Sequence, residues 1–77
     1  MIEGIEKNDL IERIKKYEAV EIMINDQKEM FFEGIIDPVY IELHFERLVK
    51  LSNNFDRVTM VGYHGNKNKE LIAEVFV

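Results

Sequence analysis

The sequence has no cysteine among its 77 residues, which excludes a disulfide scaffold, a thiol nucleophile and a thiolate metal site. Aliphatic hydroxyl groups are almost absent too: Ser52 and Thr59 are the only two, and neither is flanked by glycines as a nucleophile elbow requires. The four glycines are scattered along the chain, so no glycine-rich loop is available to cradle a phosphate. These absences favour a non-catalytic protein that carries no cofactor.

Long apolar runs are also missing, and the first ten residues, MIEGIEKNDL, carry three acids and one lysine. We therefore expect neither a targeting peptide nor a membrane span, and we expect a soluble, cytoplasmic protein. The 15 acidic and 10 basic residues give a net charge of −5. Because an acidic chain is repelled by phosphates, we expect no direct contact with nucleic acid or with an anionic membrane. The expected partner is a protein.

The sequence contains two histidines, His44 and His64. His44 stands between Glu42 and Glu46, but residues two apart on a helix point in different directions, so these three do not form a metal triad. His64 has no acidic neighbour in the sequence. We expect no metal site. Either histidine could still meet a distant carboxylate in space, which would support a small enzyme or a ligand-binding domain as an alternative function.

The first half of the chain is typical of a helix followed by a hairpin. Apolar residues at helical spacing around Leu10 and Ile14 predict a short amphipathic helix, with Asn8 or Asp9 as its N-cap. The next segment, AVEIMIN, alternates as a strand does. A tight turn at residues 26–28 then leads into a second predicted strand, EMFFEGII.

The second half begins with residues 39–51, whose pattern fits either a strand or a helix. The segment VYIELHF alternates, but Asp37 followed by Pro38 is typical of a helix start, because a carboxylate caps the helix and proline needs no N–H there. We predict a helix whose apolar residues share one face, with Glu42 on the opposite, polar face. The segments RVTMVGY and KELIAEVFV predict a second hairpin.

Two helix–hairpin units in this order predict an α+β fold of αββαββ type, with one four-stranded antiparallel sheet and both helices on one face. We expect residues 1–77 to form a single small domain. The two units, 8–36 and 38–77, also suggest an internal repeat. The segments KEMFFEGII and KELIAEVFV share the pattern K-E, three apolar residues, E, any residue and two apolar residues. A chance match of two amphipathic hairpins would explain this pattern equally well.

A sheet with both helices on one face has no helical cover on the other. Side-chain alternation along the strands predicts apolar and acidic residues together on that open face. Because a contiguous exposed apolar area usually marks an interface, we predict a non-catalytic interaction protein that uses this face to bind itself, as a homodimer, or another protein. The residues predicted to make the contact are Met23, Phe31, Ile35, Tyr63, Ile72 and Phe76, with the acids Glu21, Glu29, Glu33 and Glu74 around them.

All of the net charge lies in the first unit. Residues 1–38 hold ten acids and five bases, and residues 39–77 hold five of each. Carboxylates at alternate strand positions recur every ~6.6 Å and could imitate a row of phosphates. In size and in its Ile-, Lys-, Asn- and Glu-rich composition the chain is similar to small acidic inhibitors from phages and mobile elements, a similarity that covers no motif. It implies an alternative function as an inhibitor or mimic acting on a nucleic-acid-binding protein.

Overall fold

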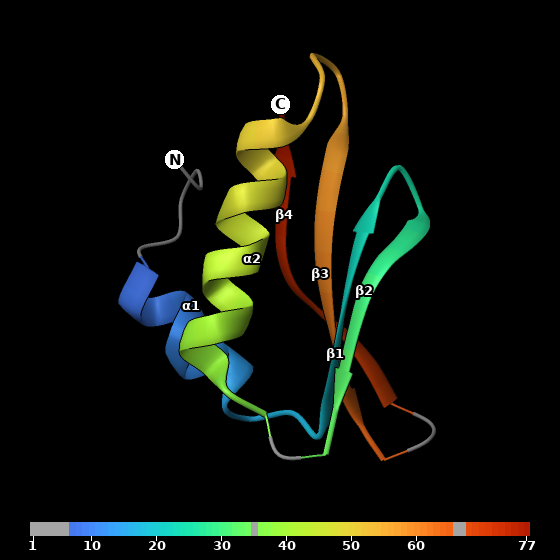
Figure 1. Cartoon of the computed structure of the whole chain (residues 1–77). Helices are drawn as coiled ribbons and strands as arrows, with labels where there is room; N and C mark the ends of the chain where they lie inside the picture. The colour runs from blue at the N-terminus through green and yellow to red at the C-terminus, as the bar shows by residue number, and fades with distance from the viewer. Residues whose placement is uncertain (1–6, 35, 66–67) are drawn as a thin grey trace.

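The computed structural model describes residues 7–34, 36–65 and 68–77. Along the chain its elements are α1 (Lys7–Ile14), β1 (Ala19–Ile24), β2 (Gln27–Glu33), α2 (Pro38–Leu51), β3 (Arg57–His64) and β4 (Asn68–Phe76) (Figure 1). This order confirms the predicted αββαββ arrangement. Neither of the two helices in the described part of the chain is long and apolar enough to cross a membrane.

Helix α2 starts where the Asp-Pro step predicts. The Asp37 side chain accepts hydrogen bonds from the backbone N–H groups of Val39 at 3.1 Å and Tyr40 at 3.3 Å, which is the geometry of an N-cap. Pro38 occupies the first turn, where its missing N–H leaves no hydrogen bond unmade. The helix ends before Ser52, so the ambiguous segment is helical.

Helix α1 is shorter, and it buries Leu10 and Ile14 against the rest of the chain. Asn8 and Asp9 lie inside this helix. The prediction that one of them is the N-cap is therefore wrong, because the helical backbone already includes Lys7. Asp9 still occupies the first turn, where a carboxylate interacts favourably with the positive end of the helix dipole.

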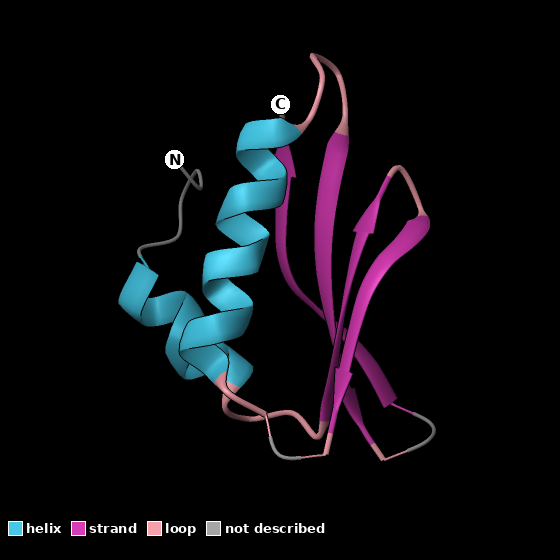
Figure 2. Ribbon diagram, viewed as in Figure 1, coloured by secondary structure: helices cyan, strands magenta, loops and turns pink. Residues whose placement is uncertain are grey.

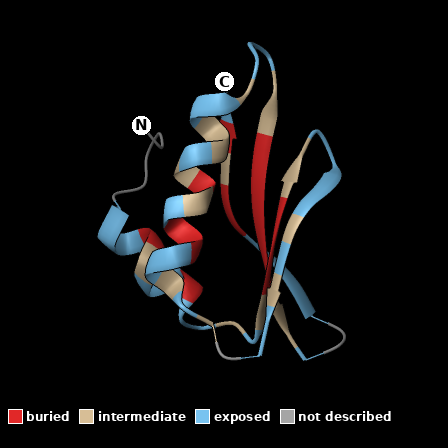
Figure 3. Cartoon of the chain, viewed as in Figure 1, coloured by how far each residue is buried: buried red, intermediate tan, exposed pale blue. Residues whose placement is uncertain are grey.

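The four strands form one antiparallel sheet in the order β2-β1-β3-β4. Both helices cover the same face of it: α1 contacts β4, α2 contacts β3, and the helices contact each other (Figure 2). The core lies between these two layers (Figure 3). Its buried members are Leu10, Ile14, Val20, Ile22, Ile41, Phe45, Val58, Met60, Ile72, Ala73 and Val75.

Strand β4 contains a β-bulge that reverses the predicted side-chain pattern of its first half. Met60 pairs with Ala73 and Val61 pairs with Leu71, so Ile72 is an extra residue with no partner of its own. Ile72 is 2% exposed and belongs to the core, whereas Leu71 is 60% exposed. The prediction that Ile72 lies on the open face and Leu71 in the core is therefore wrong. One inserted residue moves every side chain before it to the opposite face.

Glu42 is the second departure from the predicted pattern. This residue of α2 was expected in solvent, but it is 1% exposed, and its Oε1 lies 3.7 Å from Nζ of Lys7 in α1. Burial, reinforced by the neighbouring Glu46, raises the pKa of Glu42. Hydrogen bonds from Lys50 and Glu42 lower the pKa of Glu46. The pKa values of the two neighbouring carboxyl groups are therefore shifted in opposite directions.

Candidate functional site

The face of the sheet opposite the helices is referred to below as the outer face. Residues directly opposite each other in paired strands share a face, and the observed register assigns the members. The outer face consists of Ala19, Glu21, Met23, Lys28, Phe31, Glu33, Arg57, Thr59, Val61, Tyr63, Lys69, Leu71, Glu74 and Phe76.

The side chains at the centre of the outer face are buried, and large apolar side chains are exposed at its margins. Thr59 and Val61 on β3 are 6% and 3% exposed although neither α1 nor α2 covers them. Longer side chains on the neighbouring strands shield them. Phe31 on β2 is 44% exposed, and Leu71 and Phe76 on β4 are 60% and 69% exposed. Large apolar side chains therefore meet solvent on both edge strands of the sheet.

A polar cluster lies at the β2 side of the outer face. The Tyr63 hydroxyl donates a hydrogen bond to Glu21 Oε1 at 2.7 Å, and Nζ of Lys28 lies 3.3 Å from Glu21 Oε2. The bond to Glu21, together with burial, raises the pKa of Tyr63. The Phe31 ring meets Tyr63 edge-on at 6.2 Å, and the Lys28 ammonium lies 5.1 Å from the Phe31 centroid. Glu21 is thus a buried, paired carboxylate within the surface.

A second set of charges lies at the other end of the outer face. Arg57 forms an ion pair with Asp26 in the turn between β1 and β2, and its Nε lies 3.8 Å from Glu74 Oε2. Among the described residues, the outer face carries three cationic side chains, Lys28, Arg57 and Lys69, and three carboxylates, Glu21, Glu33 and Glu74. Positive and negative groups therefore alternate across it, and neither sign dominates.

The structure distributes the predicted contact residues unevenly. Phe31, Phe76 and Glu33 are exposed on the outer face, Met23, Tyr63 and Glu74 are half-buried, and Glu21 is buried. Glu29 is exposed too, but it is the extra residue of a bulge in β2 and has no partner in β1, so the register does not place it on the outer face as predicted. Ile72 lies in the core, and Ile35 is outside the described residues.

The sequence reasoning missed Leu71, which the bulge turns outward, and Arg57 and Lys28, which pair with the acids. Lys28 is opposite Met23, and Arg57 is opposite Phe76, so each lies diagonally across from its acid. Positively charged residues on strands next to those acids are the signal that could have found these two.

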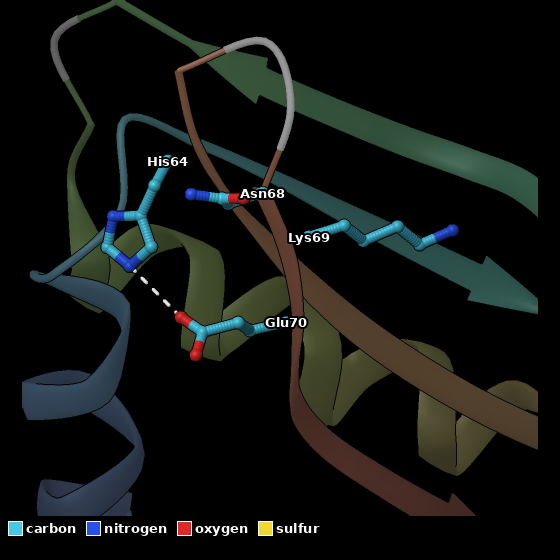
Figure 4. A pocket seen from close by; sticks show the side chains of 4 residues that line it. All are labelled: His64, Asn68, Lys69 and Glu70. Atoms are coloured by element: carbon cyan, nitrogen blue, oxygen red, sulfur yellow. Dashed lines mark ion pairs between the residues drawn. The ribbon is translucent and has the colours of Figure 1, made fainter.

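A second candidate site lies where β3 meets β4. Nε2 of His64 is 3.1 Å from Oε1 of Glu70. Figure 4 shows these two side chains pointing toward each other, with Lys69 directed away. Together with Asn68 they line an open pocket of about 460 Å³. The β4 bulge places Glu70 on the helix side of the sheet, opposite Gly62, so the distant carboxylate that His64 lacked in the sequence is supplied by the neighbouring strand.

Tyr17 completes this second cluster. Its ring packs against His64 with centroids 4.5 Å apart, and it also covers Gly62, where an added Cβ would lie 2.4 Å from the Tyr17 ring. Burial and the Glu70 carboxylate raise the pKa of Tyr17. The cluster can exchange a proton or hold a small polar group. Among residues 7–34, 36–65 and 68–77, no three metal-ligating side chains meet.

His44 has a different environment. Its ring lies 4.3 Å from that of Tyr40 and 6.2 Å from that of Phe32, in edge-on and tilted geometry. These contacts are aromatic packing between α2 and the edge strand β2.

Two surfaces therefore remain as candidates for function, the outer face and the pocket at His64. Comparisons of the chain with protein-family models, with curated proteins and with solved structures give no match. The function has to be inferred from the geometry and chemistry of these two surfaces.

Proposed function

We propose that this chain is a non-catalytic interaction protein that binds a second copy of itself through the outer face of its sheet. The observation that carries the proposal is the exposure of Phe31, Leu71 and Phe76 on a sheet face that neither helix covers. Large apolar side chains in contact with water on one face are typical of a surface that is covered by a partner.

The size of the chain supports a second copy. A single core in a domain of this length supplies only a few kcal/mol of stability, and oligomerisation is one of the common ways to add to it. Burying the three exposed side chains against a partner would remove apolar area from water and stabilise the folded chain by mass action.

The charges of the outer face support self-association over a strongly basic partner. A two-fold contact presents the same patch from both sides, so it tolerates mixed charges better than a patch of one sign. Lys28, Arg57 and Lys69 are interspersed with an equal number of carboxylates. Two such patches in opposite orientation can therefore place unlike charges together.

The alternative of an acidic inhibitor is less well supported. Imitation of phosphates requires a row of free carboxylates on the first hairpin, but Glu21 is paired with Lys28 and Asp26 with Arg57. The other alternative, ligand binding or catalysis at the pocket, is supported by the contact of His64 with Glu70. That pocket is open and lined by polar side chains, and a catalytic site needs a partly enclosed one.

The proposal is tested by measuring the solution mass with size-exclusion chromatography and light scattering, at low and high salt. We expect a dimer that persists in high salt, because the contact is largely apolar. An association that is lost in high salt would show that the charged groups, and not the apolar side chains, hold the contact. A monomer at all concentrations would contradict the proposal.

A double variant locates the contact. Phe31→Glu with Phe76→Glu places two carboxylates at exposed positions of the outer face, so we expect the dimer to dissociate while the circular dichroism spectrum is unchanged. The matched control is Leu43→Glu, a residue of α2 that is 54% exposed on the helix side of the molecule. The control should remain a dimer. Dissociation of the control and persistence of the double variant would place the interface on the helices.

A further inference from the structure

Phe55, in the turn between α2 and β3, combines two unusual properties. It is 94% exposed, and its backbone φ is +75°. The other described residues with positive φ are Asn25, Asp26, Gly34 and Gly65, all of residue types that tolerate this region. An aromatic residue does not, because its Cβ crowds the backbone there. The backbone of Phe55 is therefore strained, and its side chain does not pack against the folded core.

Hydrogen bonds on both sides hold this turn in place. The Phe55 N–H donates to the Val77 carbonyl at 2.8 Å, and the Val77 N–H donates to the Asp56 carbonyl at 2.9 Å. The Asp56 carboxylate accepts one bond from the Asn53 N–H and one from the Asn25 side-chain amide, both at 2.8 Å. The ring is therefore presented to solvent from a fixed backbone, and it would lose little conformational freedom when it meets a partner.

Two further exposed apolar side chains belong to the same end of the molecule. Leu51, the last residue of α2, is 73% exposed, and Phe76 near the end of β4 is 69% exposed. Figure 1 shows the turn after α2 and the C-terminal end of β4 at this end. Leu51, Phe55 and Phe76 are called the end patch below. Phe76 also lies on the outer face, opposite Arg57. The end patch and the outer face are therefore connected through this residue.

We propose that Phe55 is an anchor residue in the contact with a second copy of this chain, as part of an interface that includes the end patch. The proposal rests on the proposed function and names the residue at which the contact is strongest. The charged groups at this end of the molecule support a second copy as the occupant. Arg57 is paired with Asp26, and Lys50 with Glu46. Charges of both signs therefore lie side by side at this end, so two copies in opposite orientation can bring unlike charges together.

The backbone strain at Phe55 predicts how a glycine variant at this position behaves. Where a residue is strained and makes no contact inside the fold, its replacement by glycine relieves the strain at no cost in packing. Aromatic residues, phenylalanine among them, are enriched in protein interfaces. The variant Phe55→Gly is therefore expected to be at least as stable as the parent chain while it associates less. A residue that only supports the fold would change both properties in the same direction.

The experiment compares the parent chain with Phe55→Gly and with the conservative variant Phe55→Tyr. Sedimentation equilibrium over a dilution series gives the Kd of the dimer, and urea unfolding at dilutions where each protein is monomeric gives the midpoint. We expect Phe55→Gly to raise the Kd at least tenfold, which is about 1.4 kcal/mol, with an equal or higher urea midpoint. Phe55→Tyr should keep the Kd within a few fold.

Three results would overturn the proposal: a parent chain that is monomeric throughout, an unchanged Kd in Phe55→Gly, or a lower urea midpoint in Phe55→Gly. The single variant Phe31→Glu, beside Tyr63 and away from the end patch, separates this proposal from the proposed function. Loss of the dimer in Phe31→Glu with an unchanged Kd in Phe55→Gly would leave the outer face as the interface and remove Phe55 from it. The reverse pattern would retain Phe55 and remove the β2 side of the outer face.

Discussion

The two faces of the sheet reach similar burial at their centres by different means. On the inner face Val20, Ile22 and Met60 are fully buried beneath the two helices. On the outer face Val61 is 3% exposed without any such layer, because the side chains around it on three strands are longer than it is. In this sheet, large apolar side chains are buried only where the helical layer covers them. Small ones can be covered by their neighbours in the sheet, and the large ones at the margins then remain exposed.

The largest expected effect tests whether the inner layer carries the stability of the fold. Phe45 of α2 is fully buried, and Phe76 of the outer face is 69% exposed. We expect Phe45→Ala to lower the free energy of unfolding by about 3–5 kcal/mol through the cavity it leaves. Phe76→Ala should change it by no more than about 0.5 kcal/mol. Urea unfolding of the monomer measures both. Similar losses in the two variants would erase the difference between the faces.

A smaller effect is expected at the residue that positions α2 over the inner face. The Asp37 carboxylate accepts two backbone N–H groups at the start of this helix. Asp37→Ala should cost about 1 kcal/mol of unfolding free energy, and Asp37→Ser, which can also cap, should recover most of it. Thermal unfolding followed by circular dichroism gives both values. No loss in Asp37→Ala would show that packing alone sets the start of α2.

A still smaller effect is expected at Glu42, the buried carboxyl group on the helix side of the sheet. The buried carboxylate of the outer face is Glu21, which is paired with Tyr63 and Lys28. Burial raises the folded-state pKa of Glu42 above its unfolded value. Glu42 therefore stabilises the folded chain at low pH, and this contribution is lost as the pH rises through the raised pKa. Glu42→Gln stays neutral at every pH. We expect it to match the parent below the unfolded-state pKa of Glu42 and to exceed it, by roughly 0.5–1 kcal/mol, above the raised folded-state pKa.

Glu46 provides the control for this titration, because its pKa is lowered by Lys50 and by Glu42. The stability that Glu46 contributes is present above its unfolded pKa and is lost as the pH falls. Glu46→Gln should therefore be less stable than the parent at neutral pH, the opposite of Glu42→Gln. Unfolding free energies measured across the pH range give the sign for each variant. The same sign in both variants would contradict the opposite pKa shifts of the two carboxyl groups.

Much of the fold could be predicted because its information is local. The alternation of Val20, Ile22 and Ile24 indicates a strand with one buried face, and the Asp37-Pro38 step indicates a helix start whatever surrounds it. The order of the elements then leaves few topologies for so short a chain. The inner and outer assignment of β1 and β3 follows from the same alternation, and the register confirms it.

The wrong predictions of side-chain position have one cause in common. Each concerns a residue whose surroundings depend on segments that are distant in the sequence. The bulge at Ile72 arises from how β4 pairs with β3, and it moves Leu71 outward and Glu70 toward His64. The sequence pattern of α2 predicts that Glu42 lies on the polar face of this helix. In the fold, α1 packs beside Glu42 and buries it. The partners of Glu21 and Arg57 come from other strands or turns.

Propensity, capping and periodicity act over a few residues, so sequence patterns were enough to predict the elements, their order and the apolar side of most of them. The tertiary structure alone decided which side chains at the margins of the outer face meet water, which histidine finds a carboxylate, and that an aromatic residue occupies a left-handed turn at Phe55. Those outcomes depend on strand register and on hydrogen bonds between distant segments, which no local pattern encodes.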